Sequence, residues 1–217
     1  MPDTAVPARP AGPSTARRRA KDARRASLLA EAARLFARHG FDGVSLEDLG
    51  SAVGISGPAV YRHFPSKQAV LAALLVGASD RLLQGGRAVV ETVQPDVDAL
   101  GSLVAFHVDF ALTDPDVIRV QDRDLDTLAA QDRRAVRELQ RSYVDLWVGV
   151  LARLSPTTDP AELRMRAQAT FGLLNSTPHS ARSVSAARTR ALLEEMALAA
   201  LGRAADAGVP AEDARPT

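Results

Sequence analysis

The chain of 217 residues contains no cysteine, which excludes disulfide bridges and thiolate metal sites. Its four histidines do not stand at metal-ligand spacing with carboxylates within any one helical stretch. No segment approaches the roughly 18 apolar residues of a membrane-spanning helix, and residues 1–20 lack the apolar block of a secretory signal peptide. We therefore expect a cytoplasmic protein that binds no metal, no cofactor and no membrane.

Common enzyme motifs are also missing. The sequence has no HExxH pair, no phosphate-binding P-loop and no GxSxG nucleophile elbow. Without cysteine, and with few histidines, it offers little of the side-chain chemistry that nucleophilic or acid–base catalysis uses. We predict that the protein is not an enzyme, and we assign no catalytic residue.

Net charge is low but unevenly distributed. The formal charge is +1 in total. Residues 1–67 contain 11 basic and 6 acidic side chains, whereas residues 68–217 contain 16 basic and 20 acidic ones. A basic N-terminal segment is typical of a protein that meets a polyanion such as DNA, although basic tails also occur without such a partner.

Beyond its start, the chain has the apolar spacing of helices, interrupted at glycines and prolines. Met1–Thr15 holds four prolines and few large apolar residues, so we expect it to be disordered. We predict an all-α fold with helices near 26–39, 46–52, 57–64, 67–92, 97–113, 115–123, 131–154, 160–177 and 185–206. The expected organisation is a disordered basic arm (1–22), a helix-turn-helix domain (23–66), a helical effector-binding and dimerisation domain (67–207) and a flexible tail (208–217).

The helix-turn-helix prediction depends on residues 45–64. Ser45 can cap one helix, with Asp48 three residues on in a capping-box position, and Gly54 breaks that helix. Ser56 can cap the next helix, which enters the DNA major groove in such motifs. Val60 and Phe64 stand four apart and face inward, which leaves Tyr61, Arg62 and His63 at or beside the outward face.

At these residues the sequence resembles the TetR family of repressors. The similarity extends over Ala32–Leu75, AARLFARHGFDGVSLEDLGSAVGISGPAVYRHFPSKQAVLAALL. It combines many features at fixed spacing: Phe36, Gly40, Gly43, Ser45, Ala52, Gly54, Tyr61, His63, Phe64 and Lys67. The resemblance implies an all-helical homodimer that binds an operator in double-stranded DNA and a small-molecule effector. The C-terminal two thirds match only in length and helical character.

The resemblance gives phosphate-contact roles to Tyr61, His63 and Lys67. Phenol, imidazole and ammonium groups can all donate hydrogen bonds to phosphate. Ser45 opens a helix and is a further phosphate candidate, and Arg62 is the candidate base reader because arginine pairs bidentately with guanine. The remaining candidates, at the start of the third helix, are Ser56, Gly57 and Pro58, of which Gly57 and Pro58 have no polar side chain.

Each assignment to DNA has an alternative. Tyr61 could pack against the domain, His63 could cap a helix end, and Arg62 could contact phosphate alone. The basic run Ala16–Arg25 could reach the DNA backbone or a minor groove, or could be a solvated tail with only non-specific affinity.

Candidate ligand contacts cluster on three predicted helices of the second domain. Five of the nine aromatic residues of the chain fall in these segments, and aromatics dominate pockets and cores alike. The ligand-binding candidates are Phe106, His107, Phe110, Tyr143, Trp147, Phe171, Asn175 and His179. The alternative for each is plain core packing. Such a pocket suits an apolar molecule with one or two polar groups.

Two charged segments, Arg119–Asp126 and Gln131–Arg141, are typical of a solvated, ion-paired face. A second interpretation is a basic mouth for an acidic ligand such as an acyl-coenzyme A. It would be formed by Arg119, Arg123, Arg133 and Arg134.

The last two helices, Ala161–Thr177 and Ser185–Gly202, are the expected dimer interface, because their alanines allow close helix approach. In the predicted mechanism, an effector shifts the dimer away from the state that fits a near-palindromic operator, with the helix from Lys67 as the lever. The alternatives are a regulator of the same fold without a small-molecule effector, or an activator.

Overall fold

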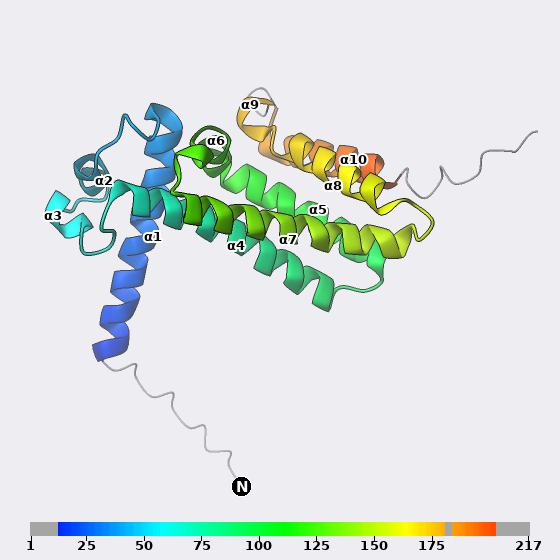
Figure 1. Ribbon diagram of the computed structural model, residues 1–217, viewed down its shortest axis with the longest axis horizontal. Coiled ribbons are helices and arrows are strands. Elements are labelled where there is room, and N and C mark those ends of the chain that lie inside the picture. The colour runs from blue at the N-terminus through cyan, green and yellow to red at the C-terminus, as the bar shows by residue number, and fades with distance from the viewer. Residues whose placement is uncertain (1–12, 181–183, 203–217) are drawn as a thin grey trace, which may run out of the picture.

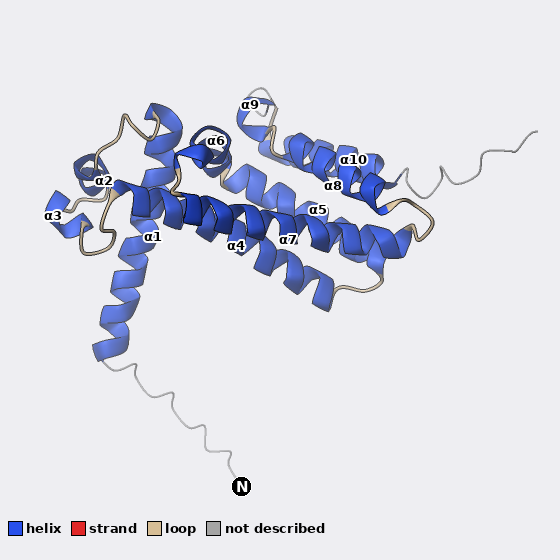
Figure 2. Cartoon of the chain, viewed as in Figure 1, coloured by secondary structure: helices blue, strands red, loops and turns tan. Residues whose placement is uncertain are grey.

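The structure is a computed structural model that describes residues 13–180 and 184–202, and every regular element in these ranges is helical (Figure 2). The all-α prediction is therefore confirmed. The elements are α1 (Pro13–His39), α2 (Leu46–Ala52), α3 (Gly57–Val60), α4 (Lys67–Thr92), α5 (Asp96–Thr113), α6 (Pro115–Asp124), η1 (Leu125–Thr127), α7 (Ala130–Leu154), α8 (Pro160–Leu174), α9 (Thr177–Ser180) and α10 (Ala186–Gly202). None of the helices in the described ranges has the length and apolar character to span a bilayer.

The helices form a small N-terminal group and a larger bundle (Figure 1). Helix α1 runs across one end of the molecule, with α2 and α3 beside it. Helices α4, α5 and α7 pack on one another as the long elements of the bundle, and α8 and α10 pack together along one side. The short helix α6 lies between the two groups and contacts α1, α4 and α5.

The prediction of a disordered arm over residues 1–22 is wrong for residues 13–22, which form the first turns of α1. Alanine and arginine have high helix propensity, and they make up most of Ala16–Arg25. The ion pair between Arg18 and Asp22, one helical turn apart, adds a weak further contribution. Residues 1–12 and the tail expected at 208–217 lie outside the described residues.

The N-terminal group packs around Phe36, Leu49, Val60 and Phe64, which are all fully buried. The predicted capping box of α2 is present, because the Asp48 backbone N–H donates to Ser45 Oγ and the Ser45 N–H donates to the Asp48 carboxylate. Helix α3 is shorter than predicted and ends at Val60. Residues that precede a proline avoid helical backbone angles, and this contributes to the irregular turns between Tyr61 and Pro65.

The bundle has its own core, centred on Trp147 and on leucines of α5, α7, α8 and α10. Helix α4 approaches its neighbours closely at two glycines, Gly85 against Phe106 and Gly86 against Tyr143. The predicted helix 160–177 ends earlier, at Leu174, and a separate turn, α9, contains Pro178. That break places Asn175 at the C-terminal cap of α8, facing α5.

Candidate DNA-binding surface and ligand cavity

The exposed polar side chains of this region lie just after α3, whose own residues, Gly57–Val60, have no polar side chain. Val60 and Phe64 face the core, whereas the Tyr61 side chain is 53% exposed and Arg62 is also exposed. An aromatic side chain with about half of its surface in solvent gains less from packing than a buried one. This exposure is compatible with the expected DNA contacts of Tyr61 and Arg62 and does not favour the packing alternative for Tyr61.

The first residues of α3 have small side chains that do not obstruct the approach of a large partner. Ser56 is the N-cap residue but makes no capping hydrogen bond, and Pro58 is exposed in the first turn. A Cβ atom added at Gly57 would lie 3.2 Å from Glu47 Cγ. A larger residue at position 57 would therefore displace Glu47 of α2, and the absence of a side chain there keeps α2 and α3 close.

Two of the predicted phosphate contacts already have partners within the protein. The Ser45 hydroxyl donates to the Asp48 carboxylate at 2.7 Å, which leaves it no proton for a phosphate. The Lys67 Nζ atom donates to the Phe41 carbonyl at 2.8 Å and lies 4.4 Å from the centre of the Phe41 ring. Lys67 thus ties the α1–α2 turn to the start of α4, with N–H donors remaining for an anion.

His63 is half-buried and lies among basic side chains. Burial first, and then the positive charges of Lys21 and Arg25, lower its pKa from the ordinary value. The imidazole is therefore uncharged at neutral pH. A contact from His63 to a phosphate would be a neutral hydrogen bond and not an ion pair.

Two arginines of the basic run donate hydrogen bonds to the backbone of the helix-turn-helix. Arg24 donates to the carbonyl of Val53 at 3.1 Å, and Arg25 donates to the carbonyl of His63 at 3.0 Å. The Arg25 guanidinium also lies 4.1 Å from the centre of the Phe64 ring. The sequence indicated only a basic run here. The contacts were not foreseen because they join residues 29 and 38 positions apart.

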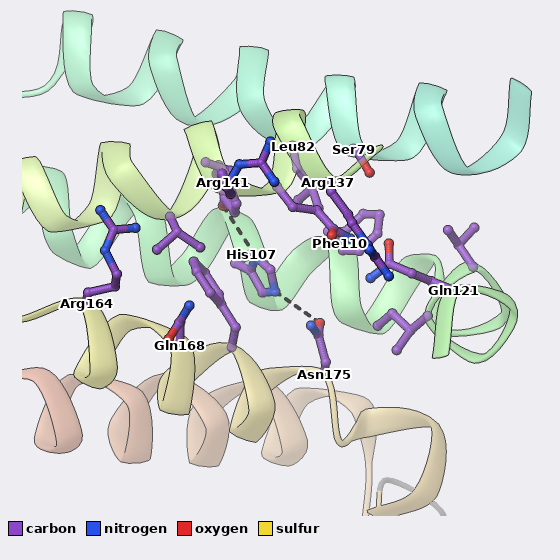
Figure 3. Close-up of a pocket in the computed structure, with 16 residues that line it drawn as sticks. Ser79, Leu82, His107, Phe110, Gln121, Arg137, Arg141, Arg164, Gln168 and Asn175 are labelled. Carbon is purple, nitrogen blue, oxygen red and sulfur yellow. Dashed lines mark hydrogen bonds between the residues drawn. The ribbon is translucent and has the colours of Figure 1, made fainter. Parts of the chain in front are cut away.

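A cavity of about 340 Å³ lies in the bundle between α4, α5, α6, α7 and α8 (Figure 3). Its volume is within the range of small-molecule sites, which is roughly 300–1,000 Å³. The walls are mostly apolar and include five of the eight predicted ligand-binding residues: His107, Phe110, Tyr143, Phe171 and Asn175. Helices that are far apart in the sequence therefore bring these five side chains to one cavity.

His107 links two polar groups in the wall of this cavity (Figure 3). Its Nε2 atom lies 3.1 Å from Asn175 Oδ1, and its Nδ1 atom lies 3.4 Å from the Tyr143 hydroxyl. Because an amide oxygen only accepts, Nε2 carries the proton and Nδ1 accepts from Tyr143. Burial lowers the pKa of His107 to about 4 and raises the pKa of Tyr143, so both groups are neutral at neutral pH.

Three predicted ligand contacts do not line the cavity. Phe106 points toward α4 and covers Gly85, and Trp147 is fully buried in the bundle core against Phe171. His179 is exposed on α9, outside the cavity. Helix α9 was not predicted, and the separate turn carries His179 away from Asn175.

The arginines at the cavity are not those considered from the sequence. Of the four expected at a basic mouth, Arg119 pairs with Asp116, Arg123 pairs with Asp124, and Arg133 donates to the Asp126 carbonyl. None of these, nor Arg134, lines the cavity. The lining arginines are Arg137 and Arg141 of α7 and Arg164 of α8.

Helices α4 and α6 contribute to both the cavity and the N-terminal group. Helix α4 starts at Lys67 and lines the cavity further along, with Ser79 and Leu82. Helix α6 lines the cavity with Ile118 and neighbouring residues, while Arg123 on the same helix donates to the carbonyls of Phe36 and Ala37 at the end of α1. The sequence indicated the α4 connection but not the one through α6.

The outer faces of α8 and α10 carry exposed apolar side chains. Met165 is 63% exposed and Met196 is 50% exposed, and the exposed residues Ala169 and Ala199 lie one turn from them on the same helices. The alanines that pack inward, such as Ala167, belong to the core of the single chain. No other element in the described part of the chain packs on these outer faces.

Two family profiles match the chain in the regions of these two features. The profile described as bacterial regulatory proteins of the tetR family matches residues 28–74, which contain α2 and α3. The profile described as the tetracyclin repressor-like C-terminal domain matches residues 94–179, which contain most of the residues that line the cavity.

Curated relatives and solved structures agree with the profiles. The chain is 30% identical over 164 residues to the HTH-type transcriptional repressor Rv1474c of Mycobacterium tuberculosis, covering 65% of this chain and 87% of the relative. It is 30% identical over 132 residues to the HTH-type transcriptional repressor KstR2 of Rhodococcus jostii, covering 60% of this chain and 65% of that relative, which is just under two thirds. A TetR-family regulator from Bordetella parapertussis superimposes with a TM-score of 0.70 at 26% identity, over 80% of this chain and 93% of that structure.

A helix-turn-helix with an exposed third helix, joined to a helical bundle with a cavity, defines a class of DNA-binding transcriptional regulators. The chain belongs to the TetR family of these regulators. Rv1474c, KstR2 and the Bordetella protein are named transcriptional repressors or regulators, the class of protein that the sequence predicted.

Proposed function

We propose that the protein is a homodimeric repressor that binds a near-palindromic operator through α3 and releases it when a small, largely apolar effector occupies the cavity. The relatives KstR2 and Rv1474c are named repressors, which supports this direction of control. Because bacterial operators lie in the cytoplasm, the proposal places the protein there.

The observation that carries the proposal is the position of α6. One face of this short helix lines the cavity through Ile118 and Gln121. Another face holds α1 through the hydrogen bonds from Arg123 to the backbone of Phe36 and Ala37. An effector that displaces α6 therefore acts directly on the longest helix of the DNA-binding group.

The second connection is through α4. Gln68 in its first turn donates to the Thr127 carbonyl at 3.2 Å, which ties α4 to the segment that follows α6. Leu82, further along α4, lines the cavity. A ligand that binds the two arrangements of α4 and α6 unequally shifts the population of the dimer between them, and equal binding would shift nothing.

The proposed dimer forms through the outer faces of α8 and α10, where Met165 and Met196 are exposed. Two copies of this helix pair, related by a two-fold axis, make a four-helix bundle. Such a dimer fits the operator when its two α3 helices are spaced by about one turn of DNA, roughly 34–36 Å.

The test is a fluorescence-anisotropy titration of a duplex from the DNA immediately upstream of the protein's own gene, at about 150 mM salt because affinity depends strongly on salt. We expect binding tighter than to a scrambled duplex by a factor of about 10³ or more. Equal and weak binding to both duplexes would contradict the proposal for this stretch of DNA.

Base reading is tested with a matched pair of variants. Arg62→Ala removes the exposed arginine next to α3, and we expect it to reduce the preference for the native duplex by about 1–3 kcal/mol. Arg87→Ala removes an arginine that is also exposed, in the distal part of α4, and should leave DNA binding unchanged. If Arg62→Ala weakens both duplexes equally, Arg62 contacts only phosphate.

A further inference from the structure

The mouth of the cavity is positively charged. Three guanidinium groups, those of Arg137, Arg141 and Arg164, belong to its lining, and no carboxylate does (Figure 3). Arg153, elsewhere in the bundle, is paired at 2.8 Å with Asp96, a carboxylate that is only 23% exposed. Arg137 and Arg164 each have a carboxylate partner outside the lining, whereas Arg141 has none, so an anion at the opening would relieve the repulsion among the three like charges.

The three arginines approach the opening from two sides. Arg137 and Arg141 stand one turn apart on α7, and they therefore share a face of that helix. Arg164 lies on α8, across the cavity from them. Guanidinium groups in such a frame can bind a carboxylate or a phosphate with two hydrogen bonds each.

The pairs that these arginines do make are weak. Arg137 lies 3.2 Å from Asp126 and Arg164 lies 2.6 Å from Asp145, but the two carboxylates are 83% and 55% exposed. Exposed pairs contribute little, about 0–1 kcal/mol. Within the ranges that the structure describes, Arg141 makes no hydrogen bond or ion pair. An anion at the mouth therefore displaces little when it binds.

The interior behind the arginines has the opposite character. Phe110, Ile118 and Phe171 are among its apolar walls, and the only titratable groups deep within it, His107 and Tyr143, are neutral at neutral pH. A charged group is therefore favoured at the opening, and an apolar group is favoured inside.

We propose that the effector is an amphipathic anion, whose apolar part fills the cavity and whose carboxylate or phosphate group is bound by Arg137, Arg141 and Arg164. The inference rests on the proposed function, because it names the chemistry of the effector. Under this inference the effector is an acid, or an ester that carries phosphate, and not a neutral apolar molecule.

Two fluorescent probes with the same ring system test the requirement for an anion. One is 8-anilinonaphthalene-1-sulfonate, and the other is N-phenyl-1-naphthylamine, which lacks the sulfonate. The chain has a single tryptophan, Trp147, which packs against the cavity residue Phe171 with ring centres 4.9 Å apart. Energy transfer from Trp147 therefore reports binding to the bundle, and the lining variants below assign that binding to the cavity.

We expect the sulfonate to bind at least about tenfold more tightly than the neutral probe, with an affinity that falls as salt is raised. The variant Arg137→Gln/Arg141→Gln/Arg164→Gln should lose this preference and keep its affinity for the neutral probe. A control, Arg81→Gln/Arg87→Gln/Arg134→Gln, removes the same charge from positions outside the lining and should keep the preference. The single variant Arg141→Lys, which keeps the charge, should retain most of the preference for the sulfonate.

The source of the anion is distinguished by displacement of the bound sulfonate. Octanoate is the carboxylate probe, and octanoyl-coenzyme A, with coenzyme A alone as its control, is the phosphate-bearing probe. Displacement by either one supports the proposal and identifies the anionic group. The proposal is overturned if both fluorescent probes bind equally well to the wild type and the triple arginine variant changes neither affinity.

Operator binding by the same variants separates the two proposals. The arginines are exposed, so we expect all of these variants to fold and to bind the native duplex as the wild type does. A wild type that prefers the sulfonate but shows no preference for the native duplex would contradict the repressor function and leave the anion site standing. A wild type with the operator preference but without the sulfonate preference would contradict only the anion site.

Discussion

The Arg123 side chain of α6 donates to the backbone carbonyl of Phe36 in the last turn of α1. The same guanidinium binds the carboxylate of Asp124, which is only 8% exposed, and this pairing raises the pKa of Arg123. A helix that lines the cavity is thus tied by one side chain to α1, which packs against α2 in the N-terminal group. The carbonyls at the end of a helix have no partner within that helix, so a cation there is favourable.

Arg123→Gln should therefore weaken the response to effector more than it weakens operator binding. Loss of the contact leaves the buried Asp124 carboxylate without its partner, so we also expect a loss of roughly 1–3 kcal/mol in the free energy of unfolding. Urea unfolding measures the loss of stability. Fluorescence anisotropy of the operator duplex, with and without a cavity ligand, measures the response to effector. Arg81→Gln, which breaks an exposed pair with Asp114, is the control and should cost less than about 1 kcal/mol. Equal losses in both variants would argue against a special role for Arg123.

Gly86→Ala should destabilise the bundle even though alanine is the better helix former. A Cβ atom at this position would lie 2.7 Å from Tyr143 Cε2, so Tyr143 or α4 must shift. We expect a net loss of roughly 1–3 kcal/mol and a weaker ligand site, because Tyr143 lines the cavity. The matched change Gly77→Ala, at a site with no atom within 4 Å, should stabilise α4 by up to about 1 kcal/mol. Thermal unfolding of the two variants measures the contrast, and stabilisation by both would contradict the close approach.

The buried His107 should make the protein less stable in mild acid. Its pKa is about 4 when folded and 6.5 when unfolded, so the unfolded chain binds the extra proton between these values. Stability is therefore fully present above about pH 6.5 and is lost as the pH falls toward 4, by up to about 3 kcal/mol from this group. His107→Gln should show a shallower loss over this window in urea unfolding. His179→Gln, on the exposed α9, should behave as the wild type, and identical pH profiles for all three proteins would contradict the prediction.

Arg25 should affect operator binding without touching DNA. Its contacts with the His63 carbonyl and the Phe64 ring hold the end of the α3 region against α1. We expect Arg25→Ala to weaken binding of the native duplex and to lower the melting temperature, while the dependence of affinity on salt stays unchanged. Removal of a residue that contacts phosphate would instead reduce the slope of log affinity against log salt concentration by about 1. Arg34→Ala, which breaks an exposed pair with Glu31 on α1 outside the basic run, is the control and should leave operator binding unchanged.

Met165→Glu should convert the proposed dimer into a monomer. A charge buried between two copies of the α8–α10 face has no partner there, which disfavours association strongly. Light scattering after gel filtration measures the mass, and operator binding should fall with it. Val97→Glu, at an apolar residue that is 60% exposed at the start of α5, should leave the mass unchanged. A Met165→Glu protein with the mass of the wild type would place the interface elsewhere.

Much of the fold follows from local signals in the sequence. Prolines and glycines mark most helix ends, so that the helix 67–92 has the predicted bounds and the helix expected at 131–154 begins one residue earlier. The capping residues Ser45 and Asp48 behave as their spacing indicated. The misjudged segments are residues 13–22, where composition suggested disorder but helix propensity prevailed, and residues 174–180, where one expected helix is two.

The cavity was only partly foreseeable. Clustered aromatics on three helices identified His107, Tyr143 and Phe171, because large apolar side chains in a small domain gather where helices face one another. The same signal also selected Trp147, which packs beside the cavity and not in it. A helix pattern shows which face points inward but does not show how far the facing helix stands from it.

The sequence by itself determined the helical class, the helix-turn-helix and the family, because helix periodicity, caps and turn residues act over a few positions. Only the tertiary structure decided that Arg137, Arg141 and Arg164 surround one opening while Arg119 and Arg123 hold other helices. These roles depend on which residues, up to 87 positions apart, come within hydrogen-bond distance. That is decided by the packing of whole helices, and the spacing of residues along the chain does not contain it.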